Sequence, residues 1–220
     1  MSPLKKPIGI DVLTAARRRI AEVFDRFDRI CVSFSAGKDS TALLHLTMDE
    51  AIRRGRKVGV LLIDLEAQYR LTIEPGDSIL LIVEDDPIWV ALPLALRNAV
   101  SQYEPKWMCW DPARRDDWVR QPPKLAITDG RAFPFFRPGM EFEEFVERFG
   151  QWYAAGALTC QLVGIRADES LNRFRTLMAR KSRFDGLRWT TWKGGTTYNA
   201  YPLYDWRTED VWTFSARDGR

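Results

Sequence analysis

The stretch from residue 33 to residue 40, SFSAGKDS, combines side chains and backbone that could hold a phosphate group. Gly37 lets the main chain approach a ligand closely, and Lys38 adds a positive charge. Ser35 and Ser40 can donate hydroxyl hydrogen bonds. Phosphate binding is therefore favoured over an ordinary connection between a strand and a helix.

The same stretch is not a Walker A motif. That motif has a Gly five residues before its Gly-Lys pair and a Ser or Thr directly after the Lys, whereas here position 32 is Val and position 39 is Asp. Asp39 would repel a bare anion. We therefore expect it to cap a helix or to help hold Mg²⁺.

The elements around this stretch place it at the start of a helix. Residues 29–34 read as a short buried strand, and a helix is expected from about Ser40 to Gly55. The apolar run 58–65, VGVLLIDL, is typical of a strand buried on both faces of a parallel sheet. This order predicts a right-handed βαβ unit, with unpaired N–H groups and the positive end of a helix dipole at the loop.

The rest of the chain predicts a doubly wound, mainly parallel α/β sheet with helices on both faces, whose ligands bind at the carboxyl ends of the strands. We interpret residues 1–220 as a single domain, with an irregular lid or insertion rich in Trp and Pro at about 105–138. Asp11 is expected to cap a first helix. The other expected elements are a strand at 88–92, helices at 94–102, 141–153 and 167–180, a strand at 160–165, and a small β-hairpin formed by 187–192 and 196–201.

Composition narrows the classes of protein. The net charge is only +3, and 45% of the 220 residues are hydrophobic, as in globular domains. The three cysteines, Cys31, Cys109 and Cys160, form no C-x-x-C pair, which disfavours a zinc site, an iron–sulfur cluster or a disulfide framework. No long apolar segment predicts a signal peptide or a membrane span, so a cytoplasmic location is expected.

Four segments in order resemble motifs of the PP-loop superfamily. SFSAGKDS is similar to its SGGxDS pyrophosphate loop. The other three resemble the branch that holds phosphoadenylyl-sulfate (PAPS) reductase and the ATP-sulfurylase small subunit: 63–72 its D-T-G…T segment, 164–173 its G-[IL]-R-x-x-x-S-x-x-R motif, and 199–212 its N-P-L-x-D-W-x-x-x-D-V-W segment. The wording of FDRICVSFS and GMEFEEF is most similar to the subgroup represented by IbrA, a co-regulator encoded by mobile elements.

The resemblance implies a site for ATP or a related adenosine nucleotide (PAPS or APS), with Mg²⁺ as a cofactor and no dedicated metal-binding residues. The end of the second strand at residues 63–65, with Asp64, would lie beside the adenosine, partly through main-chain groups. Arg166, Ser170 and Arg173 would share the start and one face of a helix and bind an anion; the alternative is a salt-bridged surface helix involving Asp168 and Glu169. Lys38 and Asp39 are the candidates for catalysis. The predicted nucleotide-binding residues are Ser33, Ser35, Ala36, Gly37, Lys38, Asp39, Ser40, Asp64, Gly164, Arg166, Ser170 and Arg173.

The resemblance also implies a reaction. PP-loop enzymes cleave ATP between its α- and β-phosphates and adenylate an oxygen, which predicts an ATP pyrophosphatase or adenylyltransferase with an unknown acceptor. PAPS reductases instead use a thiolate within an E-C-G-[IL]-H segment, and this sequence contains no such segment. Cys160 is expected in the core, whereas Cys109 could be exposed. A sulfonucleotide reductase is therefore the third choice.

The second choice is a nucleotide-sensing regulator without turnover, with a protein or ribonucleoprotein partner in a mobile-element, phage or CRISPR-related system. The segment 107–118, with Arg114, Arg115 and the following Arg120, could stack bases, but a lid packed on its own domain is favoured. An oligomer is left open. His45 is expected to be packed or half-exposed rather than catalytic.

Three departures from the family pattern bear on turnover. Ala36 stands where the family usually has Gly, which restricts positive φ and adds a methyl group facing the phosphate. Residues 75–87 are unlike the family, and the chain ends soon after Val211 and Trp212, where relatives continue. These departures put catalysis in question more than the fold.

Overall fold

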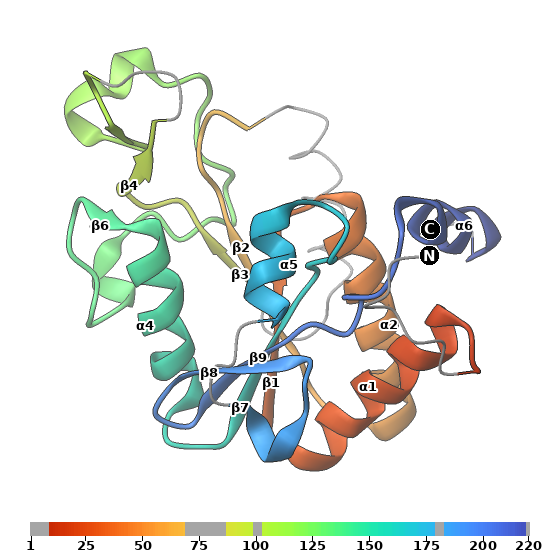
Figure 1. The fold of residues 1–220 in the computed structure, drawn as a ribbon. Coiled ribbons are helices and arrows are strands. Elements are labelled where there is room, and N and C mark those ends of the chain that lie inside the picture. Colours follow the sequence, from red (N-terminus) through yellow and green to blue (C-terminus); the bar gives the residue numbers. More distant parts are fainter. Residues whose placement is uncertain (1–8, 69–86, 99–102, 179–182, 219–220) are drawn as a thin grey trace.

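The computed structural model describes residues 9–68, 87–98, 103–178 and 183–218, which form an α/β fold around a six-stranded sheet (Figure 1). The strand order is β3-β2-β1-β7-β9-β8, and every neighbouring pair is parallel except the final β9–β8 hairpin. The strands are β1 (Arg29–Phe34), β2 (Gly59–Ile63), β3 (Pro87–Val90), β7 (Thr159–Val163), β8 (Thr190–Gly194) and β9 (Thr197–Ala200). The predicted doubly wound sheet and its C-terminal hairpin are confirmed.

Helices cover both faces of this sheet. In Figure 1, α1 (Val12–Arg26) and α2 (Lys38–Arg54) lie on one side and α4 (Phe142–Ala154) lies on the other. α5 (Leu171–Met178) follows β7, and α6 (Thr208–Asp218) packs against α2. The sheet therefore separates two hydrophobic cores.

Alternation along the strands produces these two cores. In β1, Ile30, Val32 and Phe34 face α1 and α2, whereas Cys31 faces the α4 side. The α4 side is lined by Phe145 and Phe149, which are fully buried. A parallel strand covered on both faces must be apolar on both, which explains the continuous apolar runs that predicted β1 and β2.

The ends of α1 and α2 follow the capping rules used for the prediction. Asp11 accepts a hydrogen bond from the Thr14 N–H at 2.9 Å and caps α1. Gly55 ends α2 in the left-handed region, with φ of 61°. Both boundaries are therefore set by local chemistry.

The helix predicted over 94–102 is wrong where the structure describes it. Residues 94–97 form β4 (Leu94–Arg97), which pairs antiparallel with β5 (Lys106–Met108) and parallel with β6 (Met140–Glu141); residues 99–102 lie outside the described residues. Leu94 and Met140 are partners in this small sheet and both are fully buried. Tertiary pairing thus overrides the helical preference of this Leu- and Ala-containing segment.

The region 105–138 is irregular but packed on its own domain. It contains β5 and two 3-10 helices, η1 (Pro112–Asp117) and η2 (Gly130–Ala132), while a third, η3 (Phe184–Gly186), precedes β8. Trp110 and Phe133 are buried in the core on the α4 side. Cys109 is fully buried as well, so its suggested exposure is wrong.

No helix within the described residues has the length and apolar character needed to cross a membrane.

Candidate functional site

A cavity lies at the carboxyl ends of β1 and β7, where the order of the strands reverses. The chain runs from β1 to β2 on one side of the sheet and continues through β7 and β9 on the other. The loops after β1 and β7 therefore diverge, and both line a cavity of about 390 Å³. Such a switch point is where doubly wound folds bind ligands.

Hydrogen bonds made by Ser40 close the loop between β1 and α2 on itself. The Ser40 hydroxyl donates to the Gly37 carbonyl oxygen at 2.9 Å and accepts from the Ser35 N–H at 3.2 Å. The two serine hydroxyls are 3.1 Å apart. Ser35, Gly37 and Ser40 all line the cavity, and no side chain caps the helix at Gly37. The N-terminus of α2 therefore presents its dipole to the cavity.

The backbone conformation that suits glycine falls at Ala36 rather than at Gly37. Ala36 has φ of 56°, in the left-handed region, whereas Gly37 has φ of −83°. An L side chain is strained in the left-handed region, so the loop contains local strain at the position where the PP-loop pattern has Gly.

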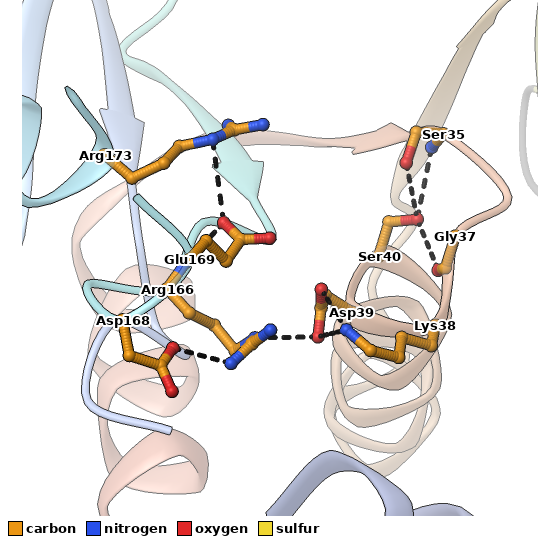
Figure 2. Close-up of polar contacts among 9 residues, drawn as sticks. All are labelled: Ser35, Gly37, Lys38, Asp39, Ser40, Arg166, Asp168, Glu169 and Arg173. Carbon is orange, nitrogen blue, oxygen red and sulfur yellow. Dashed lines mark hydrogen bonds and ion pairs between the residues drawn. The ribbon is translucent and has the colours of Figure 1, made fainter. Parts of the chain in front are cut away.

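Figure 2 shows a network of ion pairs between this loop and the turn after β7. Asp39 accepts from the Arg166 Nε at 2.8 Å and from the Lys38 Nζ at 2.8 Å and 3.0 Å. Arg166 also donates to Asp168 at 2.6 Å, and its side chain is only 4% exposed. Arg166 therefore ties the β7 turn to the first turn of α2.

Of the two candidates for catalysis, Asp39 lines the cavity and Lys38 does not. The Lys38 ammonium group contacts both oxygens of Asp39. Asp39 lies in the first turn of α2 rather than at its N-cap. Its negative charge there still interacts favourably with the helix dipole.

Gly164 allows the two loops to meet. A Cβ atom at this position would lie 3.1 Å from the backbone carbon of Asp39 and 3.1 Å from the backbone nitrogen of Ser40. Since backbone atoms give way less readily than a flexible side chain, this close approach favours glycine.

The arrangement predicted for Arg166, Ser170 and Arg173, at the entry and on one face of a helix, is found only in part. α5 begins only at Leu171, so Arg166 lies in the preceding turn and is directed to Asp39. The Ser170 hydroxyl accepts from the Arg173 N–H at 3.2 Å, as a capping residue does. The Arg173 side chain lines the cavity, and its Nε lies 3.6 Å from the Glu169 carboxylate. Pairing with Asp168 and Glu169, the alternative considered from the sequence, is what the structure shows.

Asp64 is placed differently from its neighbours. Ile63 and Leu65 line the cavity, but the Asp64 side chain is fully buried and accepts from Arg120 at 2.6 Å and from the Glu66 N–H at 2.9 Å. Asp64 can therefore act on a ligand in the cavity only through the backbone that it holds.

The sequence pointed to Ser33, Ile63 and Leu65, which line the cavity, but not to the lining residues Leu61, Phe142, Val146 and Asn199. The apolar wall is made by Leu61, Ile63, Leu65, Phe142 and Val146. These residues come from β2, the segment after it and α4. Only the packing of α4 over the sheet brings them together, and no local motif signals that contact.

The described side chains do not build a Mg²⁺ site by themselves. No group of three or more His, Cys, Asp or Glu residues among them could hold a metal ion. Asp39, the carboxylate considered for this role, already has both oxygens in contact with Lys38 and one with Arg166.

The three cysteines are buried and unsuited to act as nucleophiles. Burial raises the pKa of the Cys31 thiol to about 12 and that of Cys109 to about 11. Burial also raises the pKa of Cys160. A thiol with a raised pKa holds almost no thiolate at neutral pH.

Comparison with known sequences finds a relative but no matching family model. No protein-family model matches the chain. It is 46% identical over 222 residues to the uncharacterized protein YbdN of Escherichia coli K12, and this match covers 98% of the chain but 54% of YbdN. The chain thus spans about half the length of this curated relative.

Two solved structures share the fold at low sequence identity. PAPS reductase from Candida auris, in a phosphate complex, has a TM-score of 0.51 and 11% identity, over 93% of this chain and 80% of that one. The U34-tRNA thiolase NcsA from Methanococcus maripaludis has a TM-score of 0.50 and 8% identity, over 94% of this chain and 63% of that one. The mostly parallel sheet with its flanking helices is the PP-loop, adenine nucleotide alpha hydrolase-like fold.

Proposed function

We propose that the protein binds ATP or a related adenosine nucleotide, PAPS or APS, in the cavity between β1 and β7. The observation that carries this proposal is the division of the cavity into a polar end and an apolar wall. The polar end is the N-terminus of α2 with Ser35, Gly37 and Ser40, and the apolar wall is formed by β2, the segment after it and α4. A nucleotide has matching phosphate and base ends.

The phosphates lie best at α2. Its first N–H groups and its dipole favour negative charge, and Arg173 on the facing wall adds a guanidinium. The base then lies along Ile63, Leu65 and Phe142, whose side chains provide an apolar surface for it. The phosphate complex of the structurally similar PAPS reductase is consistent with an anion site in this fold.

We further propose an ATP pyrophosphatase or adenylyltransferase reaction with an unknown acceptor. Cleavage of ATP between its α- and β-phosphates needs no side-chain nucleophile, and the described part of the chain offers no thiolate for a reductase mechanism. Residues around the cavity would orient the phosphates and stabilise developing charge. Lys38 would contribute by transferring its contact from Asp39 to a phosphate. The IbrA-like subgroup, a Mg²⁺ requirement and a cytoplasmic location belong to the same proposal.

The decisive experiment is equilibrium titration of the purified protein with ATP, PAPS and APS, with and without Mg²⁺. Ser35→Asp introduces a negative charge at an exposed residue that lines the cavity, and Thr213→Asp introduces the same charge at an exposed residue of α6 that does not. We expect Ser35→Asp to weaken binding at least about 10-fold and Thr213→Asp to leave it unchanged. Absence of binding at millimolar ligand, or equal effects of both variants, would refute the proposal.

A nucleotide-sensing regulator is the second candidate, favoured by the pairing of every described cation around the cavity with an acid. Lys38, Arg166 and Arg173 are each paired with an acid: Asp39, Asp168 or Glu169. Binding without turnover would fit a pocket whose cations are already engaged. Release of pyrophosphate or AMP from ATP, with a cell extract as the source of acceptor, argues for the enzyme. Binding without release argues for the regulator.

The tryptophan-rich segment gives little support to a ribonucleoprotein partner for such a regulator. Trp110 is buried and packs edge-on against Trp118, with ring centroids 5.2 Å apart. The Arg115 guanidinium lies over Trp118, 5.6 Å from its centroid. These rings are occupied by the domain itself, so a protein partner is the better form of this candidate.

A further inference from the structure

We propose that Glu169 is a specificity-determining residue of the cavity, whose carboxylate competes with an anionic ligand for Arg173. This inference rests on the proposed nucleotide site and states which anions the site selects. A ligand must displace Glu169 from this guanidinium. Ligands with a long phosphate chain do so better than a single phosphate.

One carboxylate oxygen of Glu169 makes two contacts. Its Oε2 accepts from the Arg166 N–H at 3.2 Å and lies 3.6 Å from the Arg173 Nε. Glu169 lines the cavity, and its side chain is 24% exposed. Figure 2 shows Glu169 between Arg166 and Arg173, across from Ser35 and Gly37 at the start of α2.

The Glu169–Arg173 contact is weak enough to be exchanged. Its 3.6 Å separation exceeds that of a charge-assisted hydrogen bond, and the Arg173 side chain is 49% exposed. A phosphate group can engage a guanidinium through two hydrogen bonds. In contrast, Arg166 has its guanidinium committed to Asp39 and Asp168 and is almost fully buried. Arg173 is therefore the group for which ligand and Glu169 compete.

The negative charge that Glu169 keeps after a ligand displaces it from Arg173 sets the selectivity between short and long phosphate chains. A monophosphate at Arg173 makes few contacts and lies beside the carboxylate. A di- or triphosphate also reaches the N–H groups at α2, so it can offset the repulsion. We therefore expect the wild-type cavity to bind pyrophosphate and ATP more tightly than inorganic phosphate and AMP. The difference in affinity should exceed what the added contacts to α2 alone would give.

The test compares wild type, Glu169→Gln, Arg173→Gln and the double variant, with Glu147→Gln as a matched control. Glu147 is exposed on α4 and does not line the cavity. The glutamine amide oxygen at position 169 can still accept from the Arg166 N–H, so the turn is retained. Thermal unfolding monitored by circular dichroism verifies that each variant is folded. Titrations use inorganic phosphate, AMP, pyrophosphate and ATP.

We expect Glu169→Gln to tighten binding of phosphate and AMP about 5- to 10-fold, the effect of one nearby charge at a partly exposed site. The effect on pyrophosphate and ATP should be smaller. Both gains should shrink in the Arg173→Gln background, because Glu169 then has no guanidinium to withhold from the ligand. Glu147→Gln should behave as wild type.

The outcomes separate this inference from the nucleotide site. Wild-type ATP binding with unchanged phosphate and AMP affinities in Glu169→Gln overturns the inference and leaves the site standing. Weaker binding in Glu169→Gln overturns the inference too. If the weakening occurs only in the presence of Mg²⁺, Glu169 serves a cation instead. Failure of wild type and every variant to bind any of these ligands overturns both.

Discussion

Two aspartates follow neighbouring strands at the same edge of the sheet, and each binds an arginine from a distant segment. Asp39 follows β1 and contacts Arg166 at 2.8 Å, while Asp64 follows β2 and contacts Arg120 at 2.6 Å. The Asp39 side chain is 14% exposed and lines the cavity, whereas the Asp64 side chain is fully buried. Two aspartates that follow neighbouring strands thus differ: one lines the cavity, and the other is a fully buried structural clamp.

The clamp joins the end of β2 to the irregular segment 105–138. The Trp110 Nε1 donates to the Asp64 carbonyl oxygen at 2.8 Å, and the Trp110 N–H donates to Glu66 at 2.6 Å. Glu66 and Trp110 both have left-handed backbone, with φ of 63° and 52°. Within this clamp, the buried atoms Asp64 Oδ2, Arg120 Nε and Arg120 Nη1 lack a hydrogen-bond partner among the described residues. Backbone strain and unpaired polar groups are thus tolerated in the region that fixes the cavity wall containing Leu65.

The largest expected effect comes from breaking the clamp. Asp64→Ala leaves Arg120 partly buried without its carboxylate, which should lower the free energy of unfolding by about 3–5 kcal/mol. Urea unfolding followed by tryptophan fluorescence measures this loss. Replacing Asp64 and Arg120 together by leucine should cost less than Asp64→Ala alone, because no unpaired charge remains. If Asp39→Ala destabilised the fold as much as Asp64→Ala, the distinction between clamp and ligand site would be wrong.

The second effect concerns the contact between the two loops at the cavity. Gly164→Ala forces a Cβ atom to 3.1 Å from the backbone of Asp39 and Ser40, so α2 must shift. We expect a loss of about 1–3 kcal/mol of stability, with ATP binding weakened about 10-fold or more. Calorimetry and ATP titration measure the two.

Gly37→Ala is the matched control for Gly164→Ala. A Cβ atom at position 37 would meet only the Ser35 hydroxyl, at 3.5 Å, and φ there is ordinary. Its effect on stability should be below about 1 kcal/mol. Equal losses at positions 37 and 164 would show that the close approach of the loops is unimportant.

A smaller effect is expected at Ser40, which closes the loop between β1 and α2. Ser40→Ala removes the bonds to the Gly37 carbonyl oxygen and the Ser35 N–H, at a cost of about 1 kcal/mol. Because the loop loses its internal bonds, ATP binding should weaken more than stability suggests. Ser170→Ala, which removes a capping hydroxyl of α5 outside the cavity lining, should lose a similar stability but leave ATP affinity unchanged.

Local patterns were sufficient for the sheet and for the loop at α2. The apolar runs, the Asp11 cap and Gly55 depend on neighbouring residues, and the structure confirms the elements predicted from them. Contacts between distant segments were not predictable in this way. β4 forms because residues near positions 108 and 140 pair with it, and the cavity gains Phe142 because α4 packs over the sheet.

The same limit explains the arginines and Asp64. The family motif and its spacing assigned Arg166 and Arg173 to one helix entry and face, but the helix starts later and Arg166 is held by Asp39, 127 residues away. The resemblance placed the end of β2, with Asp64, beside the adenosine. The partner of Asp64, Arg120, lies in a segment without periodicity, so the sequence offered no sign that the carboxylate would be buried.

The smallest effect tests whether the strain at Ala36 belongs to ligand binding or only to the local backbone. Ala36→Gly relieves a φ of 56° and should raise stability by about 0.5–1 kcal/mol, since the gain in backbone freedom of the unfolded chain offsets part of the relief. Ala155→Gly at the end of α4, where φ is 48°, is the matched control and should give a similar gain. Because the loop already has the left-handed conformation, ATP affinity should change less than about twofold in either variant. A much tighter ATP complex in Ala36→Gly alone would mean that the alanine methyl group, rather than backbone strain, limits access of the phosphates to α2.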